Sequence, residues 1–243
     1  MAVVVVLMLG LALPVLANDR CNLDRFKDRP ICQTSTSTTT TSTSLPSTSS
    51  TAPSSTTSTL PTGGAIAGVG CSNTYDALSD PGGYLDQSSE DNLIVVAAGG
   101  HTVETWAENT QSSRKDPWGR YLSFRPVAGY TGVWFHLCER AGQLTTENVV
   151  TVLEDLVWAN DPGIPVWLSP MNTYDGVFCS VTAGNAVAED GVAVIAELDA
   201  MPNVHVGPDL GPLTSSMVRR DDCHPNDAGV ALMGSQLVEF FDG

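Results

Sequence analysis

Basic residues are scarce in this chain. Its 243 residues include 11 Lys and Arg against 27 Asp and Glu, which gives a formal net charge of −16. A surface this acidic repels nucleic acid and anionic lipid, so neither is an expected partner and a neutral substrate is favoured. Solubility, or tolerance of salt, is a simpler explanation of the same charge.

Long apolar runs are scarce as well. The uninterrupted run at residues 3–17 is short for a membrane span, which needs about 20 residues, but typical of a signal-peptide core. Small residues at Val15-Leu16-Ala17 favour cleavage after Ala17. We therefore expect a signal peptide at 1–17, a secreted or cell-surface protein, and no stable membrane span after cleavage. No Lys or Arg precedes the run, which leaves an uncleaved anchor or a misassigned start as alternatives.

The four histidines show no metal-ligand pattern. His101, His136 and His205 have no ligand spacing to the Asp221–His224 segment, so no metal site and no cofactor are expected. A metal-dependent hydrolase remains an alternative, and it would lose activity to chelators.

The six cysteines of a secreted chain predict disulfides, for which 15 pairings exist. Cys21 and Cys32 are close in sequence and are expected to close a local loop. Cys179 and Cys223 are the second candidate pair, and a bridge there would tether the segment around His224. Cys71 and Cys138 either pair with each other or are buried thiols.

Composition divides the rest of the chain into three parts. Residues 18–32 form a short segment bounded by cysteines. Residues 33–63 are almost all Ser and Thr with a few prolines, and predict a disordered linker that is either O-glycosylated or plain. Residues 64–243 are expected to fold as one catalytic domain, most simply as a monomer.

Short apolar runs alternate with helical patterns in that domain. Because the runs are continuous rather than alternating, they predict strands that are covered on both faces. The fold class is therefore α/β, a three-layer α/β/α sandwich with a central parallel sheet, and its site lies beyond the carboxyl ends of the strands. The expected strands are 65–69, 92–98, 132–137, 164–169 and 204–206, and the expected helices are 145–160, 183–200 and 226–241.

Two short motifs suggest serine-dependent acyl transfer. Ser72 follows the first expected strand, where it is either a nucleophile or an ordinary helix N-cap. About 150 residues later, Asp221 precedes His224 by three residues, so that Asp221 can orient His224 as the general base. Asp222 is the fallback acid, and a plain surface loop is the alternative to the whole pair.

Residues after the second strand are candidates for the rest of the site. Gly100 is a candidate oxyanion donor through its backbone N–H, or an ordinary turn glycine. The polar stretch 107–126 is a candidate lid or rim loop. Trp106, Trp118 and Tyr121 either line a pocket for sugar or acyl groups or pack elsewhere, in the core or on the surface.

These motifs resemble those of SGNH, or GDSL-type, hydrolases, a family with a flavodoxin-like fold that includes secreted esterases and lipases. Gly70-Cys71-Ser72-Asn73-Thr74 is similar to the first block, with Cys71 in place of Asp. Gly99-Gly100-His101-Thr102 is similar to the second block, and Asp221–His224 to the fifth, Asp-x-x-His. The resemblance implies a Ser72, His224 and Asp221 triad, with the N–H groups of Ser72 and Gly100 in the oxyanion hole.

The third block departs from the family pattern. The family has an Asn there that donates to the oxyanion, whereas this chain reads His136-Leu137-Cys138-Glu139-Arg140. Arg140 is the first candidate to donate instead, and His136 the second. Asn172, at another strand end, either lines the cleft or is a turn residue. Loss of one oxyanion donor costs about 100- to 1,000-fold in rate.

The sequence therefore predicts a secreted serine esterase that hydrolyses carboxylic esters through an acyl-enzyme. Acetyl esters of carbohydrates and short-chain lipid esters both fit as small-molecule or polysaccharide substrates. The alternative is a carbohydrate-binding module on the same fold with little or no turnover, which the missing Asn favours.

Overall fold

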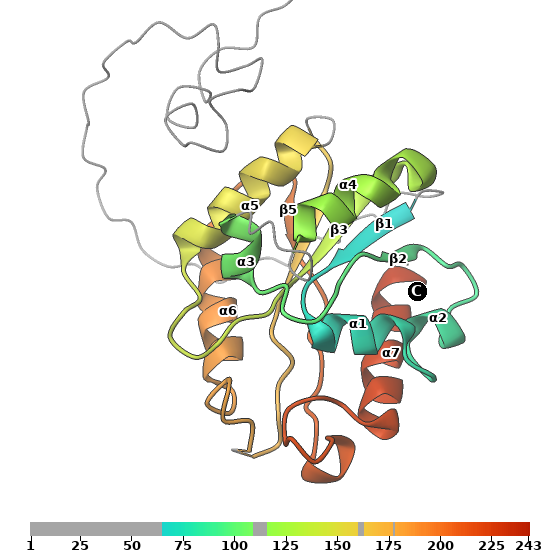
Figure 1. Cartoon of the computed structure of the whole chain (residues 1–243), viewed down its shortest axis with the longest axis vertical. Coiled ribbons are helices and arrows are strands. Elements are labelled where there is room, and N and C mark those ends of the chain that lie inside the picture. The colour runs from blue at the N-terminus through green and yellow to red at the C-terminus, as the bar shows by residue number, and fades with distance from the viewer. Residues whose placement is uncertain (1–64, 109–115, 160–162, 177) are drawn as a thin grey trace, which may run out of the picture. The chain divides into compact units, whose positions relative to one another are not determined.

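A twisted parallel sheet forms the centre of the molecule (Figure 1). The computed structural model describes residues 65–108, 116–159, 163–176 and 178–243. Within them, five parallel strands lie in the order β2-β1-β3-β4-β5. This is the flavodoxin-like strand order, and the predicted three-layer fold with a central parallel sheet is confirmed. The strands are β1 (Ala65–Val69), β2 (Leu93–Val95), β3 (Tyr130–Leu137), β4 (Val166–Pro170) and β5 (Val204–Val206).

Helices cover both faces of the sheet, and each face has its own apolar core. One core joins the sheet to α3, α4, α5 and α6, and the other joins it to α1, α2 and α7. The helices are α1 (Ser72–Ser79), α2 (Tyr84–Gln87), α3 (Val103–Ala107), α4 (Pro117–Ala128), α5 (Thr146–Ala159), α6 (Ala186–Leu198) and α7 (Asp227–Phe241), with a 3-10 turn, η3, at Ser215–Met217.

Strand β3 shows how the two cores divide the side chains. Val133 and Phe135 belong to the core under α5, whereas Trp134 points to the opposite core. Trp134 and Trp167 are both almost fully buried. Gly132 makes room for this packing, since a Cβ at that position would approach the Trp167 ring to 2.5 Å. Burial of each large apolar side chain stabilises the fold by about 1.5–3 kcal/mol.

Two helices, α2 and α4, were not expected from the sequence, whereas α3 begins where the segment 97–102 was expected to open a helix. Helix α4 occupies the second half of the stretch 107–126 that was expected to form a lid or rim loop. Trp118 and Tyr121 of α4 pack against Trp106 of α3, with ring centroids 5.0 and 6.3 Å away. All three rings are buried in the core, so the interpretation that they line a substrate pocket is wrong and the packing alternative is correct.

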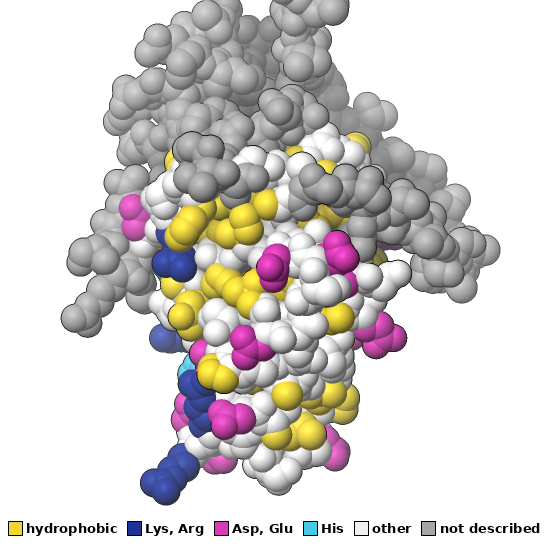
Figure 2. Space-filling model, turned by 90° about the vertical axis from the view of Figure 1, so that its right-hand side faces the viewer, with side chains coloured by type: hydrophobic (Ala, Val, Ile, Leu, Met, Phe, Trp, Pro, Cys, Tyr) yellow, Lys and Arg dark blue, Asp and Glu magenta, His cyan; other side chains and the backbone are white. Residues whose placement is uncertain are grey.

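The expected signal peptide, the segment 18–32 with Cys21 and Cys32, and the linker 33–63 lie outside the described residues. The described residues all belong to one compact unit, and none of their helices is long and apolar enough to cross a membrane. Acidic side chains are spread over the face in Figure 2 and do not gather in one patch.

Candidate active site

The turn between β1 and α1 presents Ser72. Gly70 has a φ of 152°, and a Cβ there would collide with the side chain of Thr74 and the His136 carbonyl. Only glycine therefore fits where the chain leaves the sheet. Cys71 is the N-cap of α1, and its N–H donates to Thr74 Oγ1 at 3.1 Å. This arrangement places Ser72 in the first position of the helix, at the carboxyl end of the sheet.

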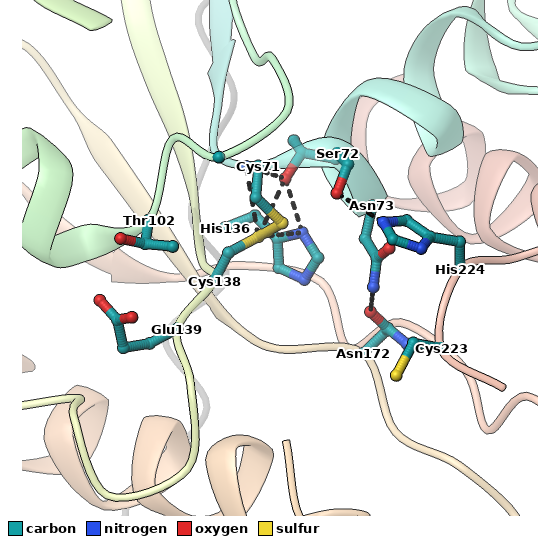
Figure 3. The surroundings of a disulfide bond; sticks show 12 residues. Cys71, Ser72, Asn73, Thr102, His136, Cys138, Glu139, Asn172, Cys223 and His224 are labelled. Atoms are coloured by element: carbon teal, nitrogen blue, oxygen red, sulfur yellow. Dashed lines mark hydrogen bonds between the residues drawn. A yellow bond between two sulfur atoms is a disulfide. The ribbon is translucent and has the colours of Figure 1, made fainter. Parts of the chain in front are cut away.

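His224 lies on the loop before α7 and faces Ser72 (Figure 3). Ser72 Oγ and His224 Nε2 are 2.8 Å apart. On the other side of the ring, His224 Nδ1 is 2.6 Å from Asp221 Oδ2. Asn226 caps α7 by accepting from the N–H groups of Ala228 and Gly229, which fixes the loop against the helix.

The carboxylate of Asp221 is held in its ionised form. Burial alone would raise the pKa, but hydrogen bonds from the His224 and Cys223 N–H groups and from the imidazole lower the pKa of Asp221 to about 2. An ionised Asp221 accepts a hydrogen bond from the Nδ1–H group of His224, which leaves Nε2 free to accept from the Ser72 hydroxyl. Asp222 has a φ of 59° and is exposed, and no hydrogen bond joins its side chain to His224 among the described residues. Asp221, and not the fallback Asp222, is therefore the acid in contact.

A cavity of about 230 Å³ opens beside Ser72 and His224. Its walls combine the turn that carries Ser72, the segment around Gly100, the ends of β3 and β4, and the loops that carry the second disulfide. Its lining residues are Cys71, Ser72, Asn73, Gly100, Thr102, Cys138, Glu139, Arg140, Met171, Tyr174, Cys179, Val181, Thr182, Cys223 and His224.

The candidate oxyanion donors differ in where they lie. Ser72, Gly100 and Arg140 all line the cavity. The N–H groups of Ser72 and Gly100 have no acceptor within the described part of the chain, and Gly100 has a φ of 78°. His136 does not line the cavity. It is fully buried, its Nδ1 is 2.9 Å from Thr74 Oγ1, and burial lowers its pKa to about 4. His136 is therefore not placed to donate to an oxyanion.

Both disulfides of the described region lie in the cavity wall. Cys71 is bonded to Cys138, which joins the residue before Ser72 to the end of β3. Cys179 is bonded to Cys223, which joins the loop after β4 to the residue before His224. Of the two states left open for Cys71 and Cys138, the structure has the pair. The sequence separation of 67 residues gave no local signal for it.

A buried polar network was missed by sequence reasoning. Asn73 Nδ2 donates to Asn172 Oδ1 at 2.8 Å, and both side chains are buried. Tyr174 Oη donates to the Cys223 carbonyl at 2.9 Å. Asn172 was expected either to line the cleft or to be a turn residue; it is not among the residues that line the cavity, and its side chain accepts from Asn73, the residue after Ser72. Strand ends of a parallel sheet converge, which was the available signal.

No group of three or more His, Cys, Asp or Glu side chains in the described residues is arranged to hold a metal ion.

The strand order and the motifs at the strand ends give the chain the architecture that its SGNH/GDSL-type resemblance implied. No protein-family model matches. Nor does any curated protein sequence match this chain.

Several solved structures are similar in fold. A carbohydrate acetylesterase family member from Sinorhizobium meliloti has a TM-score of 0.44 and 14% identity, over 72% of this chain and 95% of that one. A candidate acylhydrolase from Bacteroides fragilis has a TM-score of 0.40 and 18% identity, over 72% and 84%. A protein from Arabidopsis thaliana has a TM-score of 0.40 and 13% identity, over 60% and 58%. These likenesses are loose, and the function proposed below depends on the geometry of the site itself.

Proposed function

We propose that this chain is a serine-dependent hydrolase of carboxylic esters. The observation that carries the proposal is the continuous hydrogen-bond chain Ser72–His224–Asp221, with contacts of 2.8 and 2.6 Å at the mouth of a cavity. A nucleophile, a base and an acid that orients the base are the parts that acyl transfer requires.

The reaction follows from these positions. Ser72 Oγ attacks the ester carbonyl carbon while His224 Nε2 takes the hydroxyl proton. The carbonyl oxygen becomes an oxyanion, to which the N–H groups of Ser72 and Gly100 donate. His224 then gives its proton to the departing alcohol, and an acyl-enzyme is left on Ser72. Water, deprotonated by His224, releases the acid and restores the serine.

The cavity supports a substrate with a small acyl group. Met171, Tyr174 and the two disulfides give its walls an apolar character, and about 230 Å³ lies below the usual range of about 300–1,000 Å³ for drug-sized ligands. Acetyl esters of carbohydrates and short-chain lipid esters are the substrate classes that we propose. Two disulfides within one domain favour an oxidising compartment, in support of secretion.

A binding module with little turnover is the second candidate. The observation in its favour is the end of β3, where Cys138 is held in a disulfide and no side-chain amide donor stands. Such a module would bind carbohydrate equally well after Ser72→Ala and hydrolyse no ester in either form.

Hydrolysis of p-nitrophenyl acetate and of acetylated polysaccharide by the full chain tests the proposal. The matched variants are Ser72→Ala and, as a control, Ser235→Ala on the exposed face of α7. We expect hydrolysis by the wild type and by Ser235→Ala, and none by Ser72→Ala. A fluorophosphonate should label Ser72 and nothing else. Equal hydrolysis by folded Ser72→Ala would remove this serine from the mechanism.

A further inference from the structure

Two adjacent residues at the end of β3 contact both segments that carry the free backbone amides. The first is Cys138, whose disulfide holds Cys71 and hence the Cys71–Ser72 peptide. The Cys71 N–H also lies 3.3 Å from Cys138 Sγ and 3.1 Å from Thr74 Oγ1. The Ser72 N–H belongs to the Cys71–Ser72 peptide. These three contacts of Cys71 therefore set the direction in which the Ser72 N–H points.

The second residue, Glu139, holds the opposite wall. Its Oε2 accepts from the Glu104 N–H at 2.8 Å, and the Cys138 carbonyl accepts from the Val103 N–H at 3.0 Å. These contacts fix the start of α3, and Thr105 Oγ1 of the same helix donates to the Gly100 carbonyl at 3.1 Å. The Gly100 segment is therefore tied to the end of β3 through α3.

Glu139 is buried, with 4% of its surface exposed, although its side chain is an ionisable carboxyl group. A buried carboxylate is costly unless it is well hydrogen-bonded. Its Oε1 also accepts from the Arg140 N–H at 2.9 Å, so both oxygens are satisfied by backbone groups. Its carboxylate is thus committed to backbone groups, which leaves it a poor candidate for contact with a substrate.

We propose that Cys138 and Glu139 are positioning residues that set the direction and separation of the Ser72 and Gly100 amides, so that two backbone donors form the oxyanion hole. The proposal deepens the ester hydrolase function proposed above and rests on it. Figure 3 shows the geometry: the disulfide lies between the Ser72 turn and the side of the site that carries Thr102 and Glu139. The Cys71–Cys138 disulfide therefore fixes the backbone covalently at a strand end that has no side-chain amide.

Two variants remove the two contacts separately. Cys71→Ser/Cys138→Ser breaks the cross-link and keeps the side-chain size, and Glu139→Gln removes one of the two carboxylate acceptors while both disulfides stay intact. Glu147→Gln, an exposed residue of α5, is the matched control for Glu139→Gln. Circular dichroism selects variants that are folded.

The kinetic readout separates positioning from general damage. Each variant should lower kcat for p-nitrophenyl acetate by about 10- to 1,000-fold with KM within about threefold, because the lost interaction is made in the transition state. Affinity for phenylboronic acid should fall by a similar factor. This probe forms a tetrahedral adduct when boron bonds to Ser72 Oγ and the serine proton passes to His224. An unchanged kcat in both variants overturns the proposal, as does a loss confined to KM.

A second readout does not depend on turnover. Backbone ¹⁵N relaxation should give order parameters of about 0.85 at Ser72 and Gly100 in the wild type and clearly lower values in the variants, with Val149 of α5 unchanged. Unchanged order at both amides overturns the positioning role, even if kcat falls. A wild type that hydrolyses no ester refutes the proposed reaction, while the order parameters still decide whether the end of β3 holds these amides.

Discussion

Acidification is expected to destabilise this fold through one buried histidine, His136. The ring lies in β3 with no exposed surface and stacks on Trp134, with centroids 5.6 Å apart and planes 14° from parallel. Burial lowers the pKa of His136 from 6.5 to about 4, and the nearby Pro170 carbonyl offsets this only in part. The histidine therefore remains neutral in the folded protein at pH values where it is charged in the unfolded chain.

The sign and size of the effect follow from this difference. Between pH 6.5 and about 4 the unfolded chain binds a proton at this position and the folded chain does not, so the free energy of unfolding falls as the pH falls. The penalty is absent above about pH 6.5 and complete near pH 4. A pKa shift from 6.5 to about 4 corresponds to a loss of about 3 kcal/mol in the free energy of unfolding.

Urea unfolding of the wild type and of His136→Gln, followed from about pH 7 to about pH 4, measures this loss. Comparison with the variant cancels the contributions of the other titrating groups. We expect the stability of the wild type relative to the variant to fall by about 3 kcal/mol over that range. His136→Phe removes the proton site but keeps a ring against Trp134. Equal pH dependence in the wild type and both His136 variants would refute the reasoning.

Three further perturbations test the site and the core. Asp221→Asn should lower kcat by about 100- to 10,000-fold, because an amide favours the wrong imidazole tautomer; steady-state ester hydrolysis measures this, and a loss below about tenfold contradicts it. Tyr174→Phe leaves the buried Cys223 carbonyl without its 2.9 Å donor and should cost about 1–3 kcal/mol in urea unfolding, whereas an unchanged midpoint would contradict the assigned bond. Leu168 lies in β4 and has no exposed surface. Leu168→Ala should lower the free energy of unfolding by about 2–5 kcal/mol, and with it Tm, while the folded variant still reacts with a fluorophosphonate. A loss of labelling without a loss of Tm would show that the leucine affects the site rather than the core.

The sheet could be predicted because each strand has a local sequence signal, a short apolar run. Residues 65–69 and 204–206 form strands with the expected bounds, and the helix expected at 145–160 is α5. The strand expected at 92–98 is only Leu93–Val95, since the chain turns away once Val96 and Ala97 donate to the Gly68 carbonyl. Local pattern gives the existence of an element, and the neighbouring strand decides its end.

Helix α4 could not be predicted in the same way. Its residues include a glycine and a second proline, and its apolar side chains follow no clear helical stripe. It is stabilised by contacts of Trp118 and Tyr121 with Trp106, which comes from a different helix. Tertiary packing overrides weak local preference here.

The hydrogen-bonded serine, histidine and aspartate could be named beforehand because each lies in a short motif with its own chemical logic. Their catalytic roles remain a proposal. Of the supports around them, the Cys179–Cys223 pair was named and the Cys71–Cys138 pair was one of two states left open, but the Asn73–Asn172 bond was not predicted. Asn73 and Asn172 are 99 residues apart, and Cys71 and Cys138 are 67 apart. Such pairs depend on how the strand ends converge, which no local pattern encodes.

The short outer strands have a consequence for association between molecules. β2 and β5 are the edges of the sheet, and each has only three residues. A long exposed edge strand offers a row of unpaired N–H and C=O groups on which a second chain can add a strand. Strands of three residues offer few such groups. Growth of the sheet from one molecule into the next through β2 or β5 is therefore disfavoured, even where many copies are crowded together.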